Sequence, residues 1–585
     1  MKKNRRKVVL WACALLVLIL AIALPKAEWA YLVELLLSFA IVGVLAYNMK
    51  EENNRAKIVL LVFVAFMLLS WIVPAAYYSG QYTEQGRTQM GLFDMFNYPL
   101  TALSYFGYIA LFIVLVGGFY GILHKIPAYR TFLDKIVKKF NRKEELLLSI
   151  MVVVIALLVS FCGLHIGIAV FIPFVVSLIL LMGYDKITAA LVTVGSISAG
   201  LIGTTLADNN LNVLTQNLSL KVNYNIWVRI VILVAAIVLV IFNVIMYVRR
   251  NMSSVKVVKK AVKKAEVVVE KEIKEVKSAA KTSKKKSTSS NKKSSSSKKK
   301  SNSSKKKNNN KAALKDHNVI VLTEAETVDS DLDYVPSKTN GSHSVWPFVV
   351  TFVLLLILVV LAFVSWDAEG IGIKLFTDVI KAVTTKELFK FPIFAKILGT
   401  VNAFGSWSLT DMFVPLALIV LLLSVIYKVS FDDVLEGFVN GAKKALGPAV
   451  ISILLYAILV LVTYHPFQLV IYNFLLSLNK GFNILTTVVI AILASIFNVD
   501  MAYTFQSVLP YYVTKVTNLK DFSIVGIIFT SMYGLTALVA PTSLILMGTL
   551  SYLKVSYKDW LKTVWKLLLE LFVVLLVVFI ILALV

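Results

Sequence analysis

Apolar runs long enough to cross a bilayer recur along most of this chain of 585 residues. A transmembrane helix needs about 20 mainly apolar residues to span the hydrocarbon core. The composition is 58% hydrophobic and only 16% charged, which excludes a soluble protein of this length. The sequence therefore predicts an all-α polytopic membrane protein. The expected spans are Val8–Leu24, Ala30–Tyr47, Lys57–Tyr78, Leu100–Leu123, Thr188–Leu206, Trp227–Val248, Val345–Ser365, Thr410–Tyr427, Leu446–Tyr464, Asp521–Leu550 and Leu561–Val585.

The amino-terminal segment, MKKNRRKVVLWACALLVLILAIAL, is basic and then apolar. Its apolar part is long and no Ala-x-Ala site follows, which favours an uncleaved first span over a cleaved signal peptide. We assign residues 1–29 to an extra N-terminal transmembrane helix. Cys13 and Cys162 lie in apolar runs, so neither a disulfide framework nor a Cys-x-x-Cys metal pair is indicated.

Residues 249–344 interrupt the apolar pattern with a basic segment. From Arg249 to Asp316 there are 24 Lys and Arg against 5 Asp and Glu, a net +19 of the chain's +27. A segment of Lys, Ser and Asn cannot bury a core, so we predict a disordered linker. The alternative is an arm that binds anionic lipid or nucleic acid.

Basic residues in short loops predict the orientation, because cytoplasmic loops are rich in Lys and Arg. The amino-terminal MKKNRRK, the loop 124–144 with seven basic and two acidic residues, and the linker should face the cytoplasm. We therefore expect a multi-pass protein of the cell inner (cytoplasmic) membrane, with the N-terminus inside and the C-terminus outside. Residues 366–408, expected outside, are long enough to hold an amphipathic helix.

The chain has two similar halves once the first span is set aside. Each half consists of three spans, a folded hairpin, a span with a polar break and a last span. The first, 30–248, has its hairpin at 145–182 and its broken helix at 188–212. The second, 345–585, has its hairpin at 482–513 and its broken helix at 521–550. An odd number of crossings per half predicts an inverted-topology repeat, which is typical of secondary transporters.

Polar residues gather where each hairpin turns and where each long helix is interrupted. The turns are SFCGLHIG and FNVDMAYT, and the breaks are GLIGTTLADNN and GLTALVAPTSLILMG. Unsatisfied backbone groups are costly in lipid, so broken helices persist only where they line a cavity or are buried in protein. We therefore predict a site near mid-membrane. Its substrate-binding candidates are Ser160, Gly163, His165, Thr204, Thr205, Asn209, Asn498, Thr542 and Ser543, and its ion-coupling candidates are Asp208 and Asp500.

Five stretches carry a family resemblance: LSWIVPAAYYSGQY, VGGFYGILHK, LMGYDKIT, SFDDVLEGFVNGAKKALGPAVI and APTSLILMGTLSYLKVSYKDWLK. They resemble the YfcC-like carriers, which belong with the anaerobic four-carbon dicarboxylate carriers and basic amino acid antiporters of the ion transporter superfamily. The resemblance covers most of the chain from about Val59, except the linker. It implies two re-entrant hairpins, an elevator-like movement and a scaffold that often dimerises, so a homodimer is expected.

The hairpin tips depart from this family. The first tip lacks the usual Gly-rich acidic pattern, and the second, NVDMAYTFQSVLPYY, lacks the usual glycines. Thr536-Ala537 stands where a Thr-Asn pair is usual. The resemblance therefore predicts the fold of this chain better than it predicts the substrate.

Ionisable groups in apolar segments are costly and are candidates for function. Asp208 and Asp500 could bind Na⁺ or a proton, pair with a cationic substrate, or cap a half-helix. His165 could titrate near neutral pH or be a satisfied polar group. No arginine lies near the tips in the sequence, which favours amino acids or cations over dicarboxylates.

We thus predict a secondary active transporter of a small amino acid or carboxylate. It would act as an antiporter or with Na⁺ or H⁺ as the coupling ion, and no cofactor is expected. No enzyme is predicted, because the chain has neither a GxxxxGKS loop nor histidines at metal-ligand spacing. The alternatives are a C4-dicarboxylate carrier of the same fold, a channel, and a transport-inactive, membrane-anchored interaction protein that acts through its basic linker.

Overall fold

The computed structural model describes residues 27–48, 55–164, 166–251, 344–368, 371–387, 391–399 and 401–584. The chain divides into two compact units, Met1–Ile245 with Val335–Val585, and Met246–Tyr334. The account below concerns the first unit. The expected first span, His165 and the linker from residue 252 to 343 lie outside the described residues.

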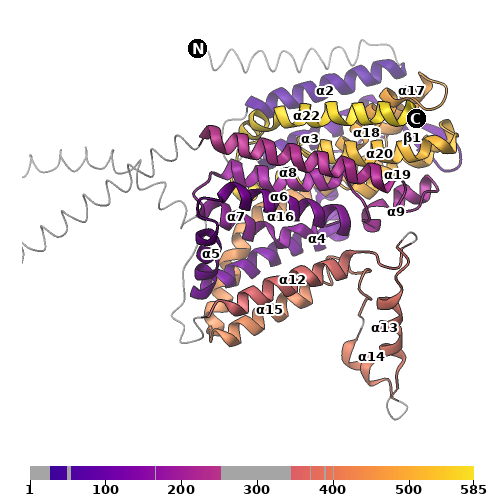
Figure 1. Ribbon diagram of the computed structural model, residues 1–585. Helices are drawn as coiled ribbons and strands as arrows, with labels where there is room; N and C mark the ends of the chain where they lie inside the picture. The colour runs from indigo at the N-terminus through magenta and orange to yellow at the C-terminus, as the bar shows by residue number, and fades with distance from the viewer. Residues whose placement is uncertain are drawn as a thin grey trace, which may run out of the picture. The chain divides into compact units, whose positions relative to one another are not determined.

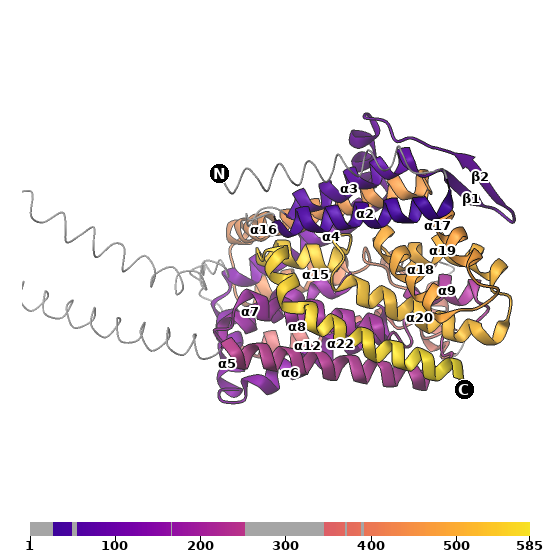
Figure 2. The ribbon, with the colours of Figure 1, turned by 90° about the horizontal axis from the view of Figure 1, so that it is seen from above.

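Helices make up most of the described first half (Figure 1). The one sheet in the described chain is an antiparallel hairpin, and its strand β1 contacts α17 (Figure 2). The elements are α2 (Glu28–Asn48), α3 (Arg55–Ile72), β1 (Ala75–Tyr78), β2 (Tyr82–Gly86), α4 (Asp94–Lys125), α5 (Pro127–Lys139), α6 (Glu144–Cys162), η1 (Gly167–Val170), α7 (Ile172–Leu181), α8 (Lys186–Ile202), α9 (Asp208–Asn217) and a helix at Ile226–Asn251.

The second half has a similar order of helices, but it lacks the strand hairpin and has the short helices α13 and α14 after α12. Its α12 and α15 lie together at one end, where Phe348 and Tyr427 stack with ring centroids 5.1 Å apart. The elements are α12 (Trp346–Phe363), α13 (Leu375–Thr385), α14 (Ile393–Leu398), α15 (Phe413–Ile426), α16 (Phe431–Tyr464), α17 (Gln468–Ser477), α18 (Ile484–Phe497), α19 (Met501–Lys515), α20 (Leu519–Ala537), α21 (Leu544–Leu553) and α22 (Tyr557–Leu584).

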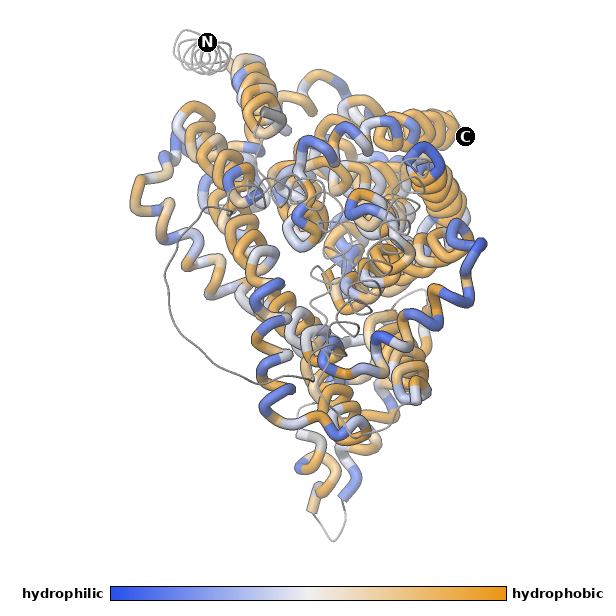
Figure 3. The backbone as a smooth tube through the Cα atoms, turned by 90° about the vertical axis from the view of Figure 1, so that its left-hand side faces the viewer, coloured by the Kyte–Doolittle hydropathy of each residue, from blue (hydrophilic) through white to orange (hydrophobic). Residues whose placement is uncertain are grey.

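Apolar side chains cover the outer faces of the long helices. Eight helices in the described residues are long and apolar enough to cross a membrane. On α22 the exposed side chains include Leu569, Val573 and Val577, and hydrophobic residues predominate along most helices (Figure 3). Exposed apolar surface of this extent marks contact with lipid. The prediction of an all-α polytopic membrane protein is therefore confirmed.

The end of one predicted span is wrong. The span expected at Lys57–Tyr78 is helical only to Ile72, and Ala75–Tyr78 pair instead with β2. Pro74 explains the difference, because proline cannot continue the hydrogen-bond pattern of the preceding turn and disfavours a helical residue before it.

Among the described residues, the most extensive contact between two helices joins α4 of the first half to α16 of the second. A Cβ on Gly117 would lie 2.7 Å from the carbonyl oxygen of Gly441, and a Cβ on Gly121 would collide with the carbonyl of Gly437. Small residues at a spacing of four let two helix backbones approach closely. Gly117 and Gly121 of α4 therefore pack directly against Gly437 and Gly441 of α16.

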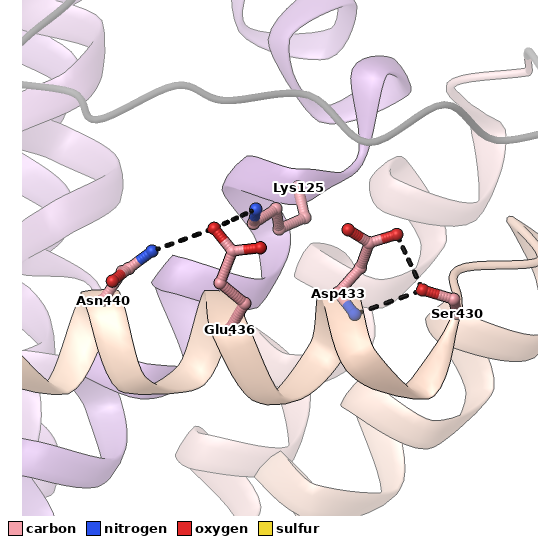
Figure 4. Close-up of polar contacts among 5 residues, drawn as sticks. All are labelled: Lys125, Ser430, Asp433, Glu436 and Asn440. Carbon is pink, nitrogen blue, oxygen red and sulfur yellow. Dashed lines mark hydrogen bonds and ion pairs between the residues drawn. The ribbon is translucent and has the colours of Figure 1, made fainter.

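An ion pair ties the end of α4 to the first turns of α16 (Figure 4). Lys125 Nζ lies 2.9 Å from Glu436 Oε1, and the lysine side chain is only 7% exposed although the glutamate is 59% exposed. Ser430 begins α16, since its Oγ accepts the Asp433 N–H at 3.1 Å. This N-cap and the ion pair fix where α16 starts against α4.

Two pairs of helices lie on either side of the polar turns of the sequence. Helices α6 and α7 flank the first turn, and α18 and α19 flank the second. Helix α13 lies in the segment expected to hold an amphipathic helix, and none of its side chains is buried. It projects with α14 from the end of α12 (Figure 1).

Candidate functional site

Four short segments define the candidate site: the first tip (163–166), the first break (203–207, between α8 and α9), the second tip (498–500) and the second break (538–543, between α20 and α21). Each tip follows a hairpin helix, and each break interrupts a long helix. The broken helices α8 and α20 pack against the hairpin helices α6 and α18 of their own half.

Ser160 joins the first hairpin to the first break. Its Oγ donates to the Gly203 carbonyl at 2.6 Å and lies 3.0 Å from Thr205 Oγ1. The Thr205 N–H donates in return to the Ser160 carbonyl at 3.0 Å. Both side chains are fully buried. The structure therefore brings together the predicted residues Ser160 and Thr205, and their bonds satisfy part of the interrupted backbone.

Gly163 lets the first tip touch the start of α9. It ends α6 with φ +69°, a conformation that favours glycine. A Cβ at this position would lie 3.2 Å from the Ala207 Cβ and 3.3 Å from Asn210 Nδ2. Thr204 is held differently, because its Oγ1 donates within the last turn of α8 to the Leu201 carbonyl at 2.7 Å.

Helix α9 turns Asn210, rather than the predicted Asn209, toward the first tip. Asn209 is exposed, whereas Asn210 is 3% exposed and its Nδ2 has no hydrogen-bond partner. Asp208 is half-buried at the first position of α9, with Asp367 as its electrostatic neighbour. A carboxylate at this end is favoured by the helix dipole. Asn210 is therefore the buried group on α9 with unused hydrogen-bonding capacity.

A buried arginine that the sequence analysis did not anticipate lies at the first break. Arg229 is 2% exposed, and its Nε donates to the Thr204 carbonyl at 2.8 Å. Its Nη1 donates to the carbonyls of Val222 at 2.7 Å and Tyr224 at 3.1 Å, and its Nη2 donates to the carbonyl of Thr205. The guanidinium carbon also lies 4.3 Å from the centroid of the Tyr224 ring. The side chain thus satisfies carbonyls that the interruption of the helix leaves without partners.

The polar side chains of the second tip form hydrogen bonds with nearby backbone groups. Asp500 Oδ1 accepts the N–H groups of Ala502 at 2.8 Å and Tyr503 at 3.4 Å, so the carboxylate is the N-cap of α19. Asn498 is buried, and its Nδ2 donates to the Ala494 carbonyl at 3.0 Å. These contacts show that Asp500 caps a half-helix, which was one of the expected roles.

Tyr533 connects the second tip to the broken helix α20. Its hydroxyl is buried and donates to the Val499 carbonyl at 3.2 Å. This bond is the counterpart of the contact between Ser160 and the first break, although its donor lies on the broken helix rather than on the hairpin. Each half therefore fastens its tip to its own broken helix.

The second break leaves one hydroxyl without a partner. Thr542 is fully buried and its Oγ1 has no hydrogen-bond partner, whereas Ser543 begins α21 by accepting the Leu546 N–H at 3.3 Å. A buried hydroxyl without a partner is costly, and it marks a place where a ligand or water can bind. Thr542 is thus a predicted residue of the second half whose hydroxyl has unused hydrogen-bonding capacity.

Helix α22 supplies the donors for the carbonyls of the second break. Trp560 Nε1 donates to the Leu538 carbonyl at 2.9 Å, and the Tyr557 hydroxyl donates to the Val539 carbonyl at 2.6 Å. In the first half, Arg229 does the same from the helix at Ile226–Asn251, which follows α9. Each break is therefore repaired by the second helix after it in the chain, with a cation in one half and neutral groups in the other.

The two broken helices meet beside the breaks. Ser531 Oγ donates to the Ile202 carbonyl at 3.1 Å, and a Cβ on Gly534 would lie 2.8 Å from the carbonyl carbon of Leu201. The last turn of α8 therefore lies directly against α20, a few residues before each helix is interrupted.

Two cavities lie near these segments, and both are apolar. One, of about 460 Å³, lies among α2, α3, α18, α20 and α22 and includes Pro541 and Tyr557 in its wall. The other, of about 90 Å³, lies among α4, α7, α8, α16 and α21. None of the predicted site residues lines either cavity. Of the predicted polar residues, Ser160 and Thr205 are instead packed against each other.

Comparison with known families decides what kind of protein has this arrangement. A family model described as DcuC, C4-dicarboxylate anaerobic carrier, matches residues 53–314 and 303–584. The chain belongs to the C4-dicarboxylate anaerobic carrier family. The match confirms the resemblance noted from the sequence, and it covers both halves of the carrier. No curated protein and no solved structure matches the chain significantly.

Four residues of the candidate site were not predicted: Asn210, Arg229, Tyr557 and Trp560. A signal existed for the last two, because they lie in the SYKDW segment, which is part of the same family-like stretch as the Pro-Thr-Ser break. Arg229 was also detectable, as a lone charge one turn inside an apolar span. Arg229 contacts the first break, at the carbonyls of Thr204 and Thr205, rather than a tip, so the expectation that no arginine lies near the tips stays a prediction.

Proposed function

We propose that this carrier binds a small dicarboxylate anion between its tips and breaks and moves it across the membrane as a secondary transporter. The observation that carries the proposal is the contact between hairpin and broken helix in each half. In the first half the end of α6 contacts the first break through Ser160 and Thr205, and in the second half Tyr533 of α20 contacts the second tip. Re-entrant tips and broken helices at the interface of inverted repeats form the substrate sites of secondary transporters.

The charge of the first break favours an anion over a cationic amino acid. Arg229 brings a positive charge to this break, and the amide of Asn210 offers an N–H donor nearby. The acid of the second tip, Asp500, is already engaged by two N–H groups of α19. Family membership supports the same substrate class, so the dicarboxylate alternative is preferred to the amino acid reading.

Exchange or coupling to Na⁺ or H⁺ would drive the transport, and an elevator-like movement of the hairpins and broken helices against α4 and α16 would alternate access. The carrier would lie in the cytoplasmic membrane as a homodimer. Its N-terminus and basic linker would face the cytoplasm, with the linker against anionic lipid, and its C-terminus would lie outside.

Counterflow in proteoliposomes tests the substrate class. Vesicles loaded with unlabelled succinate should take up labelled succinate from outside, and vesicles loaded with arginine or asparagine should not. Saturable uptake that requires internal succinate supports the proposal. Uptake driven by either amino acid and not by succinate would contradict it, and unitary currents in planar bilayers would indicate a channel.

A further inference from the structure

The positive charge at the first break is not neutralised by an acid. In the described part of the chain, no carboxylate forms an ion pair with Arg229, and four of its five N–H groups donate to backbone carbonyls. The ring of Tyr224, 4.3 Å away, is the remaining group that stabilises the charge. Arg229 therefore holds its positive charge in a buried position, without an ion-paired acid among the described residues.

Hydrogen bonding alone does not require this charge. The second break also has two carbonyls that lack a partner within the helix, those of Leu538 and Val539. They accept hydrogen bonds from neutral groups, the N–H of Trp560 and the hydroxyl of Tyr557. An ionised side chain inside a membrane is expensive and, where it occurs, usually serves ion or substrate binding. The difference between the two halves thus points to a role for the charge itself.

Carbonyl oxygens at an unwound helix end are also a typical site for Na⁺ in secondary transporters. At the first break, the carbonyls of Thr204 and Thr205 accept from the guanidinium instead. Ser160 and Thr205 fasten the first hairpin to this same segment. The guanidinium of Arg229 therefore binds the carbonyls to which an exchangeable ion could otherwise bind.

We propose that Arg229 is a positioning residue that replaces an exchangeable cation at the first break and gives the site its preference for a dianion. The proposal rests on the proposed function, because it names the group that selects a carboxylate. Asn210 supports it: a buried amide Nδ2 without a partner lies at the first tip, and it is a donor suited to a carboxylate oxygen.

The selectivity test uses Arg229→Gln with succinate and its mono-amide, succinamate, as ligands. Affinities come from the ligand-dependent thermal shift of the purified carrier. Arg55→Gln is the matched control, because Arg55 is also buried and donates to two carbonyls, those of Leu550 at 3.1 Å and Val555 at 2.8 Å. We expect Arg229→Gln to lower the ratio of succinate to succinamate affinity by about tenfold or more, and Arg55→Gln to leave this ratio unchanged.

A second arm tests the replaced cation without any substrate. Arg229→Ala leaves the carbonyl oxygens without their donor, so methylguanidinium or Na⁺ should raise its unfolding temperature more than that of the wild type or of Arg55→Ala. An unchanged affinity ratio in Arg229→Gln, or an Arg229→Ala variant that responds to neither cation, would overturn the inference. If the wild type binds no succinate, the proposed function fails. The thermal shift of Arg229→Ala with methylguanidinium or Na⁺ still tests the role of Arg229 in that case.

Discussion

Ser531 on α20 donates a hydrogen bond of 3.1 Å to the carbonyl of Ile202 on α8, and this bond joins the two halves of the carrier beside both breaks. The two residues are 329 positions apart in the chain. Since α8 and α20 are each interrupted a few residues further on, this contact brings the two breaks to the same region of the fold.

The crossing of α4 and α16 has no room for a side chain. Gly441→Ala would place a Cβ against the carbonyl of Gly117, and we expect the free energy of unfolding to fall by about 1–3 kcal/mol. Gly43→Ala is the control, because no atom lies within 4 Å of its Cβ position on α2. Thermal unfolding in detergent compares the two. Equal stability of both variants would contradict the close crossing.

The bond between the first hairpin and the first break should appear as energetic coupling. Ser160→Ala and Thr205→Val each remove a buried hydroxyl from the same pair, so a double-mutant cycle should give a coupling of about 1 kcal/mol. Ser149→Ala with Thr205→Val is the control cycle, because Ser149 Oγ donates within α6 to the Glu145 carbonyl. Additive effects of Ser160→Ala and Thr205→Val would mean that the two segments are not joined.

Trp560 should stabilise the second break through its N–H group. Trp560→Phe keeps an aromatic ring but leaves the Leu538 carbonyl without its donor, so the unfolding free energy should fall by about 1–3 kcal/mol. Trp565→Phe, on the exposed face of the same helix, should change it little. The comparison is read from thermal unfolding, and a similar loss in both variants would indicate ring size rather than the hydrogen bond.

Thr542 separates stability from substrate binding. Its buried hydroxyl has no partner in the protein, so Thr542→Val should leave the unfolding temperature without substrate unchanged or slightly raised. If the hydroxyl binds substrate, the apparent affinity for succinate should fall by about tenfold, since a hydrogen bond to a charged group is worth about 1.5–3 kcal/mol. Unchanged uptake kinetics would remove Thr542 from the site.

Asp500 has a structural role that must be distinguished from ion coupling. Asp500→Ala removes the N-cap of α19 and should cost about 1 kcal/mol of unfolding free energy, whereas Asp500→Asn keeps a capping side chain and should cost less. If Asp500 also binds the coupling ion, Asp500→Asn will lose uptake that depends on a Na⁺ or proton gradient while it retains stability. Full gradient-driven uptake in Asp500→Asn would limit this residue to the cap.

The parts of the fold that sequence predicts are those fixed by local chemistry. The length of an apolar run places a helix, and polar residues with Pro541 interrupt one, so the spans, hairpins and breaks were predictable. The end of α3 was missed because Ala75–Tyr78 continue the apolar run and could equally be helix or strand. Asn209 was chosen over Asn210 because the side of α9 that meets the tip depends on where the helix begins.

The partners of Arg229 illustrate what the sequence cannot show. The guanidinium binds main-chain carbonyls, and a carbonyl has no sequence signature. Whether an acidic side chain forms an ion pair with Arg229 could not be read from the sequence, because it depends on where the fold places the acids. Residues that contact the side chains of a motif are therefore easier to predict than residues that bind main-chain groups.

The location of bound substrate is the most direct test of the account. An experimental map of the carrier in lipid nanodiscs with saturating succinate should show ligand density at the first tip, within hydrogen-bond distance of Asn210 and on the side of the first break that carries Arg229. Succinate density only in the apolar cavity beside Pro541, or elsewhere with Asn210 still unoccupied, would contradict the central claim that the tips and breaks form the substrate site.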